Sequence, residues 1–387
     1  MKWRLGLAGA VALALGCTES LPVEPAADLA AARGGMTAAG AQTVVTMQQN
    51  LFVGFDIDAF IGGLLGGDPE AALMTAYGEL LRTDFPARAS RIADEIARTR
   101  PQVVAVQELS EITLTVPGTP ISYYMDFADV LLDELAARGL DYDLYVVENM
   151  NLPDVVPGPV VAGLVDRDGL LVRGDLVVSD DGADIYTLCL GTGATCIGGG
   201  LPFAILRGYV WVDVEVAGMP VRVVSTHLES GTSAPVRYVR ASQAAELMVA
   251  LAEVETPVIV MGDMNEEQGG APNPSIGGPL PDLPSTHDIF MLGGFTDLWA
   301  AMRPGAAGLT CCNAPDLSNG LPGYYERIDY VLLRGFTWPS GTPQGKIAVM
   351  ASTPAGTFPN TAGLPIWPSD HAGLTASLLF PPAWGTR

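Results

Sequence analysis

Positive charge is scarce in this sequence. Lysine and arginine together contribute 20 residues against 43 aspartates and glutamates, so the formal net charge is −23 at pH 7. A charge of this size repels nucleic acid and anionic lipid at long range and promotes solubility. It argues against a tight nucleic-acid binder, although an enzyme can still contact a phosphate chain briefly through a metal ion.

The sequence also lacks a recognisable boundary between domains. After about residue 41 the sequence contains no linker rich in proline or charge and no internal repeat. Apolar residues make up 49% of the chain and charged residues only 16%, which is ample material for a large core. We therefore expect one domain over residues 41–387, rather than two smaller ones, and a monomeric protein.

The N-terminus lacks a run long enough to cross a membrane. Leu5–Leu15 is apolar, but it is too short to span a bilayer as a mature helix. Its basic start and the small residue before Cys17 give it the layout of an export signal. It resembles a bacterial lipoprotein signal, although Ala14 stands where leucine is usual. We expect a signal peptide over residues 1–17 with Cys17 as the lipidated first residue; ordinary cleavage nearby is the alternative.

Residues 18–40 carry no apolar periodicity. They are rich in alanine, proline, glycine and acidic residues, so we expect a flexible tether there. The protein is then exported, either as a lipoprotein of the bacterial cell envelope (outer membrane or periplasm) or as a secreted protein. Contact with a membrane is expected only through a lipid anchor.

Cysteine is rare outside the signal. The remaining four form no C-x-x-C motif and have no histidine close by in the sequence, which argues against a zinc site. An even number in an exported chain suggests two disulfides. Cys189 and Cys196 flank a glycine-rich loop that closes a small ring at little cost, so we expect them to pair. Cys311 and Cys312 then pair as neighbours; crossed pairing between the two loops is the alternative.

Predicted strands and helices alternate along the chain, which indicates an α/β protein. Helical spacing is present in Phe85–Pro101, Tyr124–Arg138 and Pro235–Val254. Strand-like runs cover Gln42–Asn50, Val103–Glu108, Leu144–Val147, Gly208–Val216, Pro220–Ser230, Val258–Met261, Arg327–Leu333 and His371–Phe380.

Polar residues stand at the edges of these strand-like runs. Val258–Met261, for example, leads directly into Gly262, Asp263 and Asn265. Asp and Asn after Gly are common turn formers, because their side chains bond nearby backbone, so one such pair has a purely structural explanation. The same arrangement recurs at Asn50, Glu108, His227, Asp329, Asp370 and His371. This recurrence favours a site on the rim of a sheet over a series of unrelated turns.

Six short motifs at these positions resemble one family. In chain order they are "QN", "VQE", "STHLES", "GDMNEE", "RIDYVL" and "SDHAGL". Together they look like the endonuclease/exonuclease/phosphatase superfamily, over nearly the whole stretch from Asn50 to about Phe380. The resemblance implies a four-layer α/β/β/α sandwich with two packed mixed sheets. It also implies cleavage of a phosphate ester that depends on a divalent metal ion.

The resemblance also implies roles for the metal and the attacking water. Glu108 would be the main metal carboxylate, with Asn50 beside it. Mg²⁺ is the expected ion, with Mn²⁺ as a possible substitute, because Mg²⁺ accepts a few oxygen ligands and retains water. Asp263 would orient or deprotonate the water that attacks phosphorus.

The remaining motif residues would bind the phosphoryl group. Asn265 would hold it, and His227 would donate to a non-bridging oxygen as charge builds up. His371 would pair with Asp370, whose carboxylate would fix the tautomer of the ring and raise its pKa. Asp329 would be a further carboxylate near the metal or His371.

Two parts of the family pattern are not assigned by any local motif. Many members carry an additional Tyr or Arg near the phosphate and an acidic partner for the middle histidine. Tyr123, Tyr124, Asp168 and Arg173 are candidates for these positions. The segment Asn149–Gly163, rich in proline and valine, has no clear counterpart, and substrate choice is expected to depend on such loops.

Three functions remain open at this point. The leading hypothesis is an exported phosphodiesterase of nuclease type that acts on DNA or RNA. The second is a phospholipid or sphingomyelin phosphodiesterase, which would benefit from aromatic residues on a membrane-facing hairpin; Trp338 and Trp367 are isolated in the sequence. The third is a binding protein that keeps the fold without the chemistry, although no key motif position is missing. An inositol phosphate is a further possible substrate.

Overall fold

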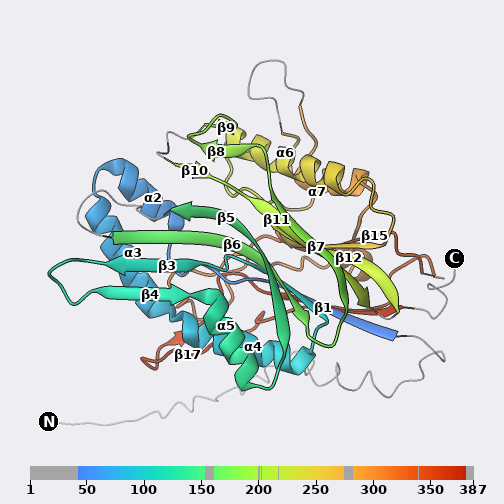
Figure 1. Ribbon diagram of the computed structural model, residues 1–387, viewed down its shortest axis with the longest axis horizontal. Helices are drawn as coiled ribbons and strands as arrows, with labels where there is room; N and C mark the ends of the chain where they lie inside the picture. Colours follow the sequence, from blue (N-terminus) through green and yellow to red (C-terminus); the bar gives the residue numbers. More distant parts are fainter. Residues whose placement is uncertain are drawn as a thin grey trace, which may run out of the picture. The chain divides into compact units, whose positions relative to one another are not determined.

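Two β-sheets pack face to face, and helices cover their outer faces (Figure 1). This computed structural model describes residues 42–152, 161–198, 201, 203–216, 218–273, 282–338 and 340–380. The predictions for the signal peptide, Cys17 and the tether lie outside the described residues. Within them, no helix is long and apolar enough to cross a membrane.

The first sheet has eight strands and is mixed, with one parallel pair among antiparallel ones. Its members are β1 (Gln42–Asn50), β2 (Val103–Gln107), β3 (Glu111–Thr115), β4 (Ser122–Asp126), β5 (Tyr142–Leu152), β6 (Val161–Arg173), β16 (Gly345–Val349) and β19 (Leu374–Phe380). The order is β16-β19-β1-β2-β6-β3-β4, and β5 pairs with β6. The β1 and β2 strands run parallel, whereas β19 runs antiparallel to β1.

The second sheet has six strands and is mixed in the same way. Its members are β7 (Val178–Ile185), β11 (Gly208–Val216), β12 (Met219–His227), β13 (Val258–Asp263), β14 (Thr296–Asp297) and β15 (Asp329–Arg334). The order is β14-β15-β13-β12-β11-β7, with β12 parallel to β13 and β15 antiparallel to it. Small separate sheets contain β8 (Cys189–Gly191), β9 (Cys196–Ile197) and β10 (Ala204–Ile205), and β17 (Phe358–Pro359) with β18 (Pro365–Ile366).

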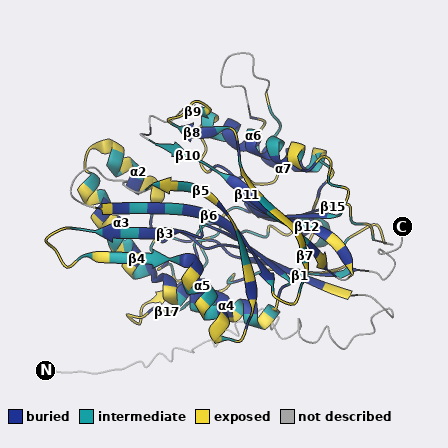
Figure 2. Ribbon diagram, viewed as in Figure 1, coloured by how far each residue is buried: buried dark blue, intermediate teal, exposed yellow. Residues whose placement is uncertain are grey.

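Alternating side chains on the central strands divide the core into layers. On β13, Val258 and Val260 face the helix-covered side, while Ile259 and Met261 face the other sheet. Successive strand residues point to opposite faces, so a strand buried on both sides reads as a continuous apolar run. Figure 2 shows the buried strands between helices whose outward faces are exposed. The predicted four-layer sandwich is confirmed.

Helices from two parts of the chain form the outer layers. The first sheet is covered by α2 (Ile57–Gly66), α3 (Pro69–Thr83), α4 (Phe85–Thr99) and α5 (Phe127–Ala137), and the second by α6 (Ala234–Ala250) and α7 (Thr286–Leu292). Short helical turns, α8 (Leu298–Met302) and η1 (Pro354–Gly356), lie in later connections. In α4 the buried Ala89, Ile92 and Ile96 recur at helical spacing, and Asp84 caps its start by accepting from the Ala87 N–H.

One predicted helix begins later than its sequence pattern suggests. Tyr124 was expected in a helix, but it lies on β4, and α5 begins at Phe127. Asp126 caps this helix, because its carboxylate accepts from the Ala128 N–H at 2.8 Å. The two tyrosines before it favour an extended backbone, so the cap at Asp126, rather than the apolar spacing, sets the boundary.

An apolar cavity of about 40 Å³ lies between α2, α3, β3 and β6. Phe55, Leu80, Ile112 and Leu164 are among the residues that line it. A phosphate needs polar partners, so this cavity is a packing gap in the core rather than a phosphate site.

Candidate active site

The sheet topology brings the predicted site residues to one edge of the sandwich. The parallel β1 and β2 end beside each other at Asn50 and Gln107, directly before Glu108. In the second sheet, His227 at the end of β12 is in register with Asp263 at the end of β13. The antiparallel β15 starts at the same edge, with Asp329 opposite Asp263.

Asn50 connects the carboxylates of the two sheets. Its Nδ2 donates to Glu108 Oε1 at 2.9 Å and to Asp263 Oδ2 at 3.1 Å. The sequence placed these three residues more than fifty positions apart from one another, and the structure brings them into direct contact. Glu108 has a φ of 55°, in the left-handed region that is uncommon for residues other than glycine.

His371 pairs with Asp329, not with Asp370 as the sequence suggested. Its Nδ1 donates to Asp329 Oδ2 at 2.9 Å, whereas the Asp370 carboxylate accepts from the Ser369 hydroxyl. Side chains of neighbouring residues usually point apart, so Asp370 is poorly placed to hydrogen-bond to the ring of His371. Asp329, at the start of β15 in the other sheet, faces the ring directly.

The surroundings of the His371 ring favour its cationic form. Burial alone would lower the pKa of His371, but the carboxylates of Asp329, Asp370 and Asp263 raise it well above its ordinary value. Its Nε2 lies 3.6 Å from Asp263 Oδ2. A positive hydrogen-bond donor therefore faces the central carboxylate of the cluster.

Asp263 is buried among polar groups. Burial raises its pKa to about 7; His371 opposes that shift and Asp329 adds to it. The backbone N–H of Asn265 donates to Asp263 Oδ1 at 2.9 Å, which fixes the carboxylate plane. A carboxylate with a pKa near neutrality is suited to accept a proton from water.

His227 approaches the same carboxylate oxygen of Asp263, and its surroundings favour the neutral ring. Burial, followed by the nearby Arg207 and His371, holds the pKa of His227 well below its ordinary value. Its Nε2 is 3.6 Å from Asp263 Oδ2 and 3.0 Å from Asn265 Nδ2. Asn265 also donates to the Leu228 carbonyl, so the amide is held on the His227 side of the site.

Arg207 is a site residue that the sequence reasoning missed. Its Nη1 donates to His227 Nδ1 at 3.1 Å, and its guanidinium lies 3.6 Å from Glu229 and 3.8 Å from Asp166. The sequence contained an indication of this, because Arg207 directly precedes Gly208 at the start of β11 and is therefore a polar residue at the edge of a strand, like the other site residues. Arg173, one of the candidates named from sequence, instead pairs with Asp175.

Asp168 is the nearest acidic group to Nδ1 of His227. Its Oδ1 lies 3.9 Å from His227 Nδ1, farther than Arg207, so it is not the main partner of the ring. Asn149 donates to both Asp168 and Asp166 from the neighbouring strand. Asn149 thus belongs to the site, while residues 153–160 of the same segment lie outside the described residues.

The charge of this cluster fits a divalent cation. Burial raises the pKa of Asp370 to about 6, and Glu108 adds to that shift, so the carboxylates crowd one another. Asp263 and Asp329, opposite each other on β13 and β15, belong to the same group of carboxylates. The oxygen-rich donor set of Glu108, Asn50 and the neighbouring aspartates suits Mg²⁺ or Mn²⁺ better than a soft metal.

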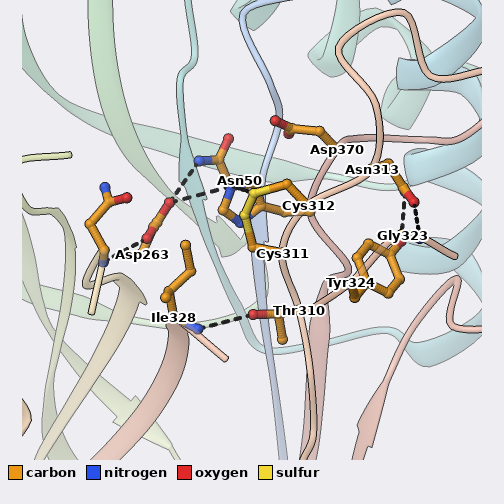
Figure 3. Close-up of a disulfide and its surroundings, with 12 residues drawn as sticks. Asn50, Asp263, Thr310, Cys311, Cys312, Asn313, Gly323, Tyr324, Ile328 and Asp370 are labelled. Atoms are coloured by element: carbon orange, nitrogen blue, oxygen red, sulfur yellow. Dashed lines mark hydrogen bonds and ion pairs between the residues drawn. A yellow bond between two sulfur atoms is a disulfide. The ribbon is translucent and has the colours of Figure 1, made fainter. Parts of the chain in front are cut away.

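The cysteines of each predicted pair lie next to each other, and the Cys189–Cys196 disulfide is confirmed. Cys189 and Cys196 form a disulfide with their Cα atoms 4.3 Å apart, as expected for local pairing. Cys311 and Cys312 are joined as neighbours (Figure 3). The Sγ of Cys312 lies 4.0 Å from His371 Nε2, so this pair borders the site.

The segment after Cys312 packs against the loop that carries His371. Asn313 donates from its backbone N–H to the Asp370 carbonyl at 2.8 Å. Its side chain donates to the Tyr324 hydroxyl at 3.0 Å and accepts from the Gly323 N–H at 2.9 Å, as Figure 3 shows. These contacts hold the cysteine pair at the edge of the cluster.

The sequence and the fold are similar to those of known proteins. A family model described as the endonuclease/exonuclease/phosphatase family matches residues 64–371. A structure named for the same family from Beutenbergia cavernae is 20% identical, with a TM-score of 0.52, and covers 87% of this chain and 71% of that one. No curated protein matches the sequence.

Two further solved structures share the fold. One from Bacteroides thetaiotaomicron is 16% identical, with a TM-score of 0.52, over 88% of this chain and 99% of that one. One from Leptotrichia buccalis is 14% identical, with a TM-score of 0.51, over 87% and 100%. At these identities the similarity concerns the fold alone.

Proposed function

The chain belongs to the endonuclease/exonuclease/phosphatase family, whose members hydrolyse phosphoester bonds, and we propose that it is an exported, divalent-metal-dependent phosphodiesterase of nuclease type. One observation carries the proposal. The buried carboxylate of Asp263, whose pKa is raised to about 7, has one oxygen 3.6 Å from both His371, where the cationic ring is favoured, and His227, where the neutral ring is favoured. A base and donors of both charge states are thus arranged around one point.

Asp263 acts on the attacking water. Its ordered carboxylate orients the water for in-line attack on phosphorus and accepts the proton as the new bond forms. Asn50 and the Asn265 backbone hold the two carboxylate oxygens in place. This leaves little freedom for the carboxylate to turn away from the reacting atoms.

The donors around Asp263 stabilise the phosphoryl oxygens. His371 supplies a positive N–H. His227 accepts from Arg207 at Nδ1, so the proton of its neutral ring is on Nε2, which supplies a second donor beside the Asn265 amide. Arg207 adds a further charge behind His227. Glu108 and Asn50 would hold the metal ion, which supplies charge neutralisation at the phosphate when it is bound.

The substrate is proposed to be a phosphodiester, with nucleic acid as the first candidate. Trp367 and Trp338 do not favour the phospholipid alternative, because Trp367 is fully buried and Trp338 packs onto Phe336 and Phe380. A binding protein without activity is disfavoured because each motif position carries a side chain of the required chemistry.

A generic phosphodiester tests the chemistry before the substrate is known. Purified protein should release p-nitrophenol from bis-p-nitrophenyl phosphate when Mg²⁺ or Mn²⁺ is present and stop when the metal is chelated. A panel of DNA, RNA, sphingomyelin and inositol phosphates then identifies the substrate class. Full activity after exhaustive chelation would contradict the proposed metal dependence.

Glu108→Gln should weaken metal binding more than it harms the rest of the site. The substitution removes the main anionic ligand but keeps the size of the side chain and one oxygen. Loss of a residue that only supports a metal ligand typically lowers metal affinity by about 10–100-fold. Because Glu108 is proposed to be a ligand itself, we expect the metal concentration for half-maximal activity to rise by more than that. Activity should recover partly at high Mg²⁺ or Mn²⁺. A metal titration that overlays on that of the wild type would remove Glu108 from the ligand set.

Export through a lipidated Cys17 is proposed as the route to the cell envelope. Cys17→Ala should release the protein from the membrane fraction into a soluble one, because the anchor requires the thiol. Fractionation and mapping of the mature N-terminus check this. A mature terminus at another residue would rule out the lipoprotein assignment.

A further inference from the structure

Arg88 of α4 is fully buried beneath the candidate active site. Its four hydrogen bonds all go to backbone carbonyls, those of Thr83, Leu51, Phe52 and Pro368. Burial lowers the pKa of Arg88 to about 10, so the guanidinium is still charged at neutral pH. A buried cation is costly unless its donors are satisfied, and here the loops around the site supply the acceptors.

Two consecutive peptide groups connect Arg88 to the predicted metal ligands. In the first, the Leu51 carbonyl accepts from Arg88, and the Phe52 N–H donates to Asn50 Oδ1 at 2.9 Å. In the second, the Phe52 carbonyl accepts from Arg88 at 3.1 Å, and the Val53 N–H donates to Glu108 Oε2 at 2.6 Å. The peptide unit is planar and trans, so its C=O and N–H point in opposite directions. Anchoring each carbonyl therefore aims the N–H on its other side.

The backbone conformation of Phe52 makes this double anchoring possible. Successive carbonyls of an extended strand point in opposite directions, so Leu51 and Phe52 would not both reach one guanidinium. Phe52 has a φ of 62°, in the left-handed region, which a bulky aromatic residue rarely adopts. The turn at Phe52 places both carbonyls on the Arg88 side and both N–H groups on the side of the site.

A third contact extends to the loop that carries His371. Arg88 Nη1 donates to the Pro368 carbonyl at 3.4 Å. The next residue, Ser369, donates from its hydroxyl to the Asn50 carbonyl at 2.7 Å and accepts from the His371 N–H at 3.1 Å. The guanidinium therefore lies where the β1–α2 loop meets the loop before β19.

We propose that Arg88 is a positioning residue for the metal site, which holds two peptide groups so that their N–H groups fix the side chains of Asn50 and Glu108. Each Glu108 oxygen then has one fixed donor, Asn50 Nδ2 on Oε1 and the Val53 N–H on Oε2. The inference rests on the proposed metal dependence, but it concerns a residue that touches neither metal nor substrate.

Arg88→Lys tests the inference with a readout other than activity. Lysine keeps the charge but cannot present several N–H groups in the fixed fork of a guanidinium, so it anchors fewer carbonyls. We expect the Kd for Mn²⁺, measured by electron paramagnetic resonance, to rise about 10–100-fold. Arg91→Lys is the matched control, because Arg91 lies on the same helix and only pairs with Glu95 at the surface. A folded Arg88→Lys protein with wild-type Mn²⁺ affinity would overturn the proposal.

Hydrogen exchange of the wild-type protein covers the case in which Arg88→Lys does not fold. In the metal-free protein, the Phe52 and Val53 amides should exchange as slowly as those of β1, because Arg88 holds their peptide groups without help from the metal. Rapid exchange of these amides would also overturn the proposal. If the wild type binds no Mn²⁺, the proposed metal dependence fails, while the exchange measurement still decides the role of Arg88.

Discussion

Replacing Asp263 by Asn is expected to lower kcat by about 10²–10⁴-fold, the range for loss of a positioned general base. Asn has nearly the same shape and still accepts a hydrogen bond from the Asn265 N–H, but it does not accept a proton from water. The carboxylate itself is the group on which both histidine rings converge. Steady-state kinetics at saturating metal and substrate measure the effect.

The same variant makes a separate prediction about stability. The pKa of Asp263 in the fold, about 7, lies above its value in an unfolded chain. The folded state therefore binds more protons than the unfolded state between pH 4 and 7, and stability falls as pH rises through that window. Asp263→Asn removes this dependence, so the metal-free variant should be at least as stable as the wild type at pH 8.

A surface substitution separates the two effects. Asp175→Asn changes an exposed aspartate that pairs with Arg173 and should leave kcat unchanged. Thermal unfolding of all three proteins at pH 5 and pH 8 shows whether the Asp263 variant is folded. Retention of more than about a tenth of wild-type kcat by the folded variant would exclude the range expected for a general base.

The polar strand ends that the sequence singled out lie together in the structure, because strand ends are easy to recognise and the sheet topology aligns them. The apolar run before Asp263 and the run before Glu108 are central strands buried on both faces, so their polar ends are conspicuous. Parallel pairing of β1 with β2 and of β12 with β13 then brings these ends together. A correct prediction of these strands therefore also predicts where most of the clustered polar residues lie.

Partner choice within the cluster was beyond the reach of the sequence. Asp370 is adjacent to His371 in the chain and Asp329 is not, yet Asp329 makes the hydrogen bond. That outcome depends on the register between two sheets, which no local pattern encodes. Arg207 stands at a strand edge, but its contact with His227 crosses to another strand, and no local pattern indicates that contact.

The helices α2 and α3 were also not foreseen. The segment Ile57–Gly66 contains several glycines and little contrast between its faces, so no helical periodicity stands out. Its helix depends on caps and on packing: Asp56 accepts from the Ala59 N–H at 2.9 Å, and Phe60 is buried in the core. Tertiary contact, rather than local propensity, decides the structure here.

His371→Ala is expected to lower kcat by about 10²–10³-fold, the usual cost of removing one preorganised donor from a transition-state site. The ring supplies a positive N–H toward the position where charge builds up on the phosphoryl oxygens. Asp329 holds the ring through Nδ1 at 2.9 Å, so Nε2 is the atom that faces the site. Alanine removes both the charge and the donor.

The pH dependence of kcat shows whether the charge of His371 is what matters. Burial alone would lower the pKa of His371, but Asp329 and the other carboxylates raise it well above the ordinary value. Asp329→Asn removes the largest of these raising charges, so the pKa of His371 falls. The alkaline limb of the kcat profile should then move to lower pH, while at low pH, where the ring is protonated in both proteins, the variant should come closer to wild-type kcat. An alkaline limb that stays in place in a folded Asp329→Asn protein would mean that His371 acts without its charge, or that another group sets this limb.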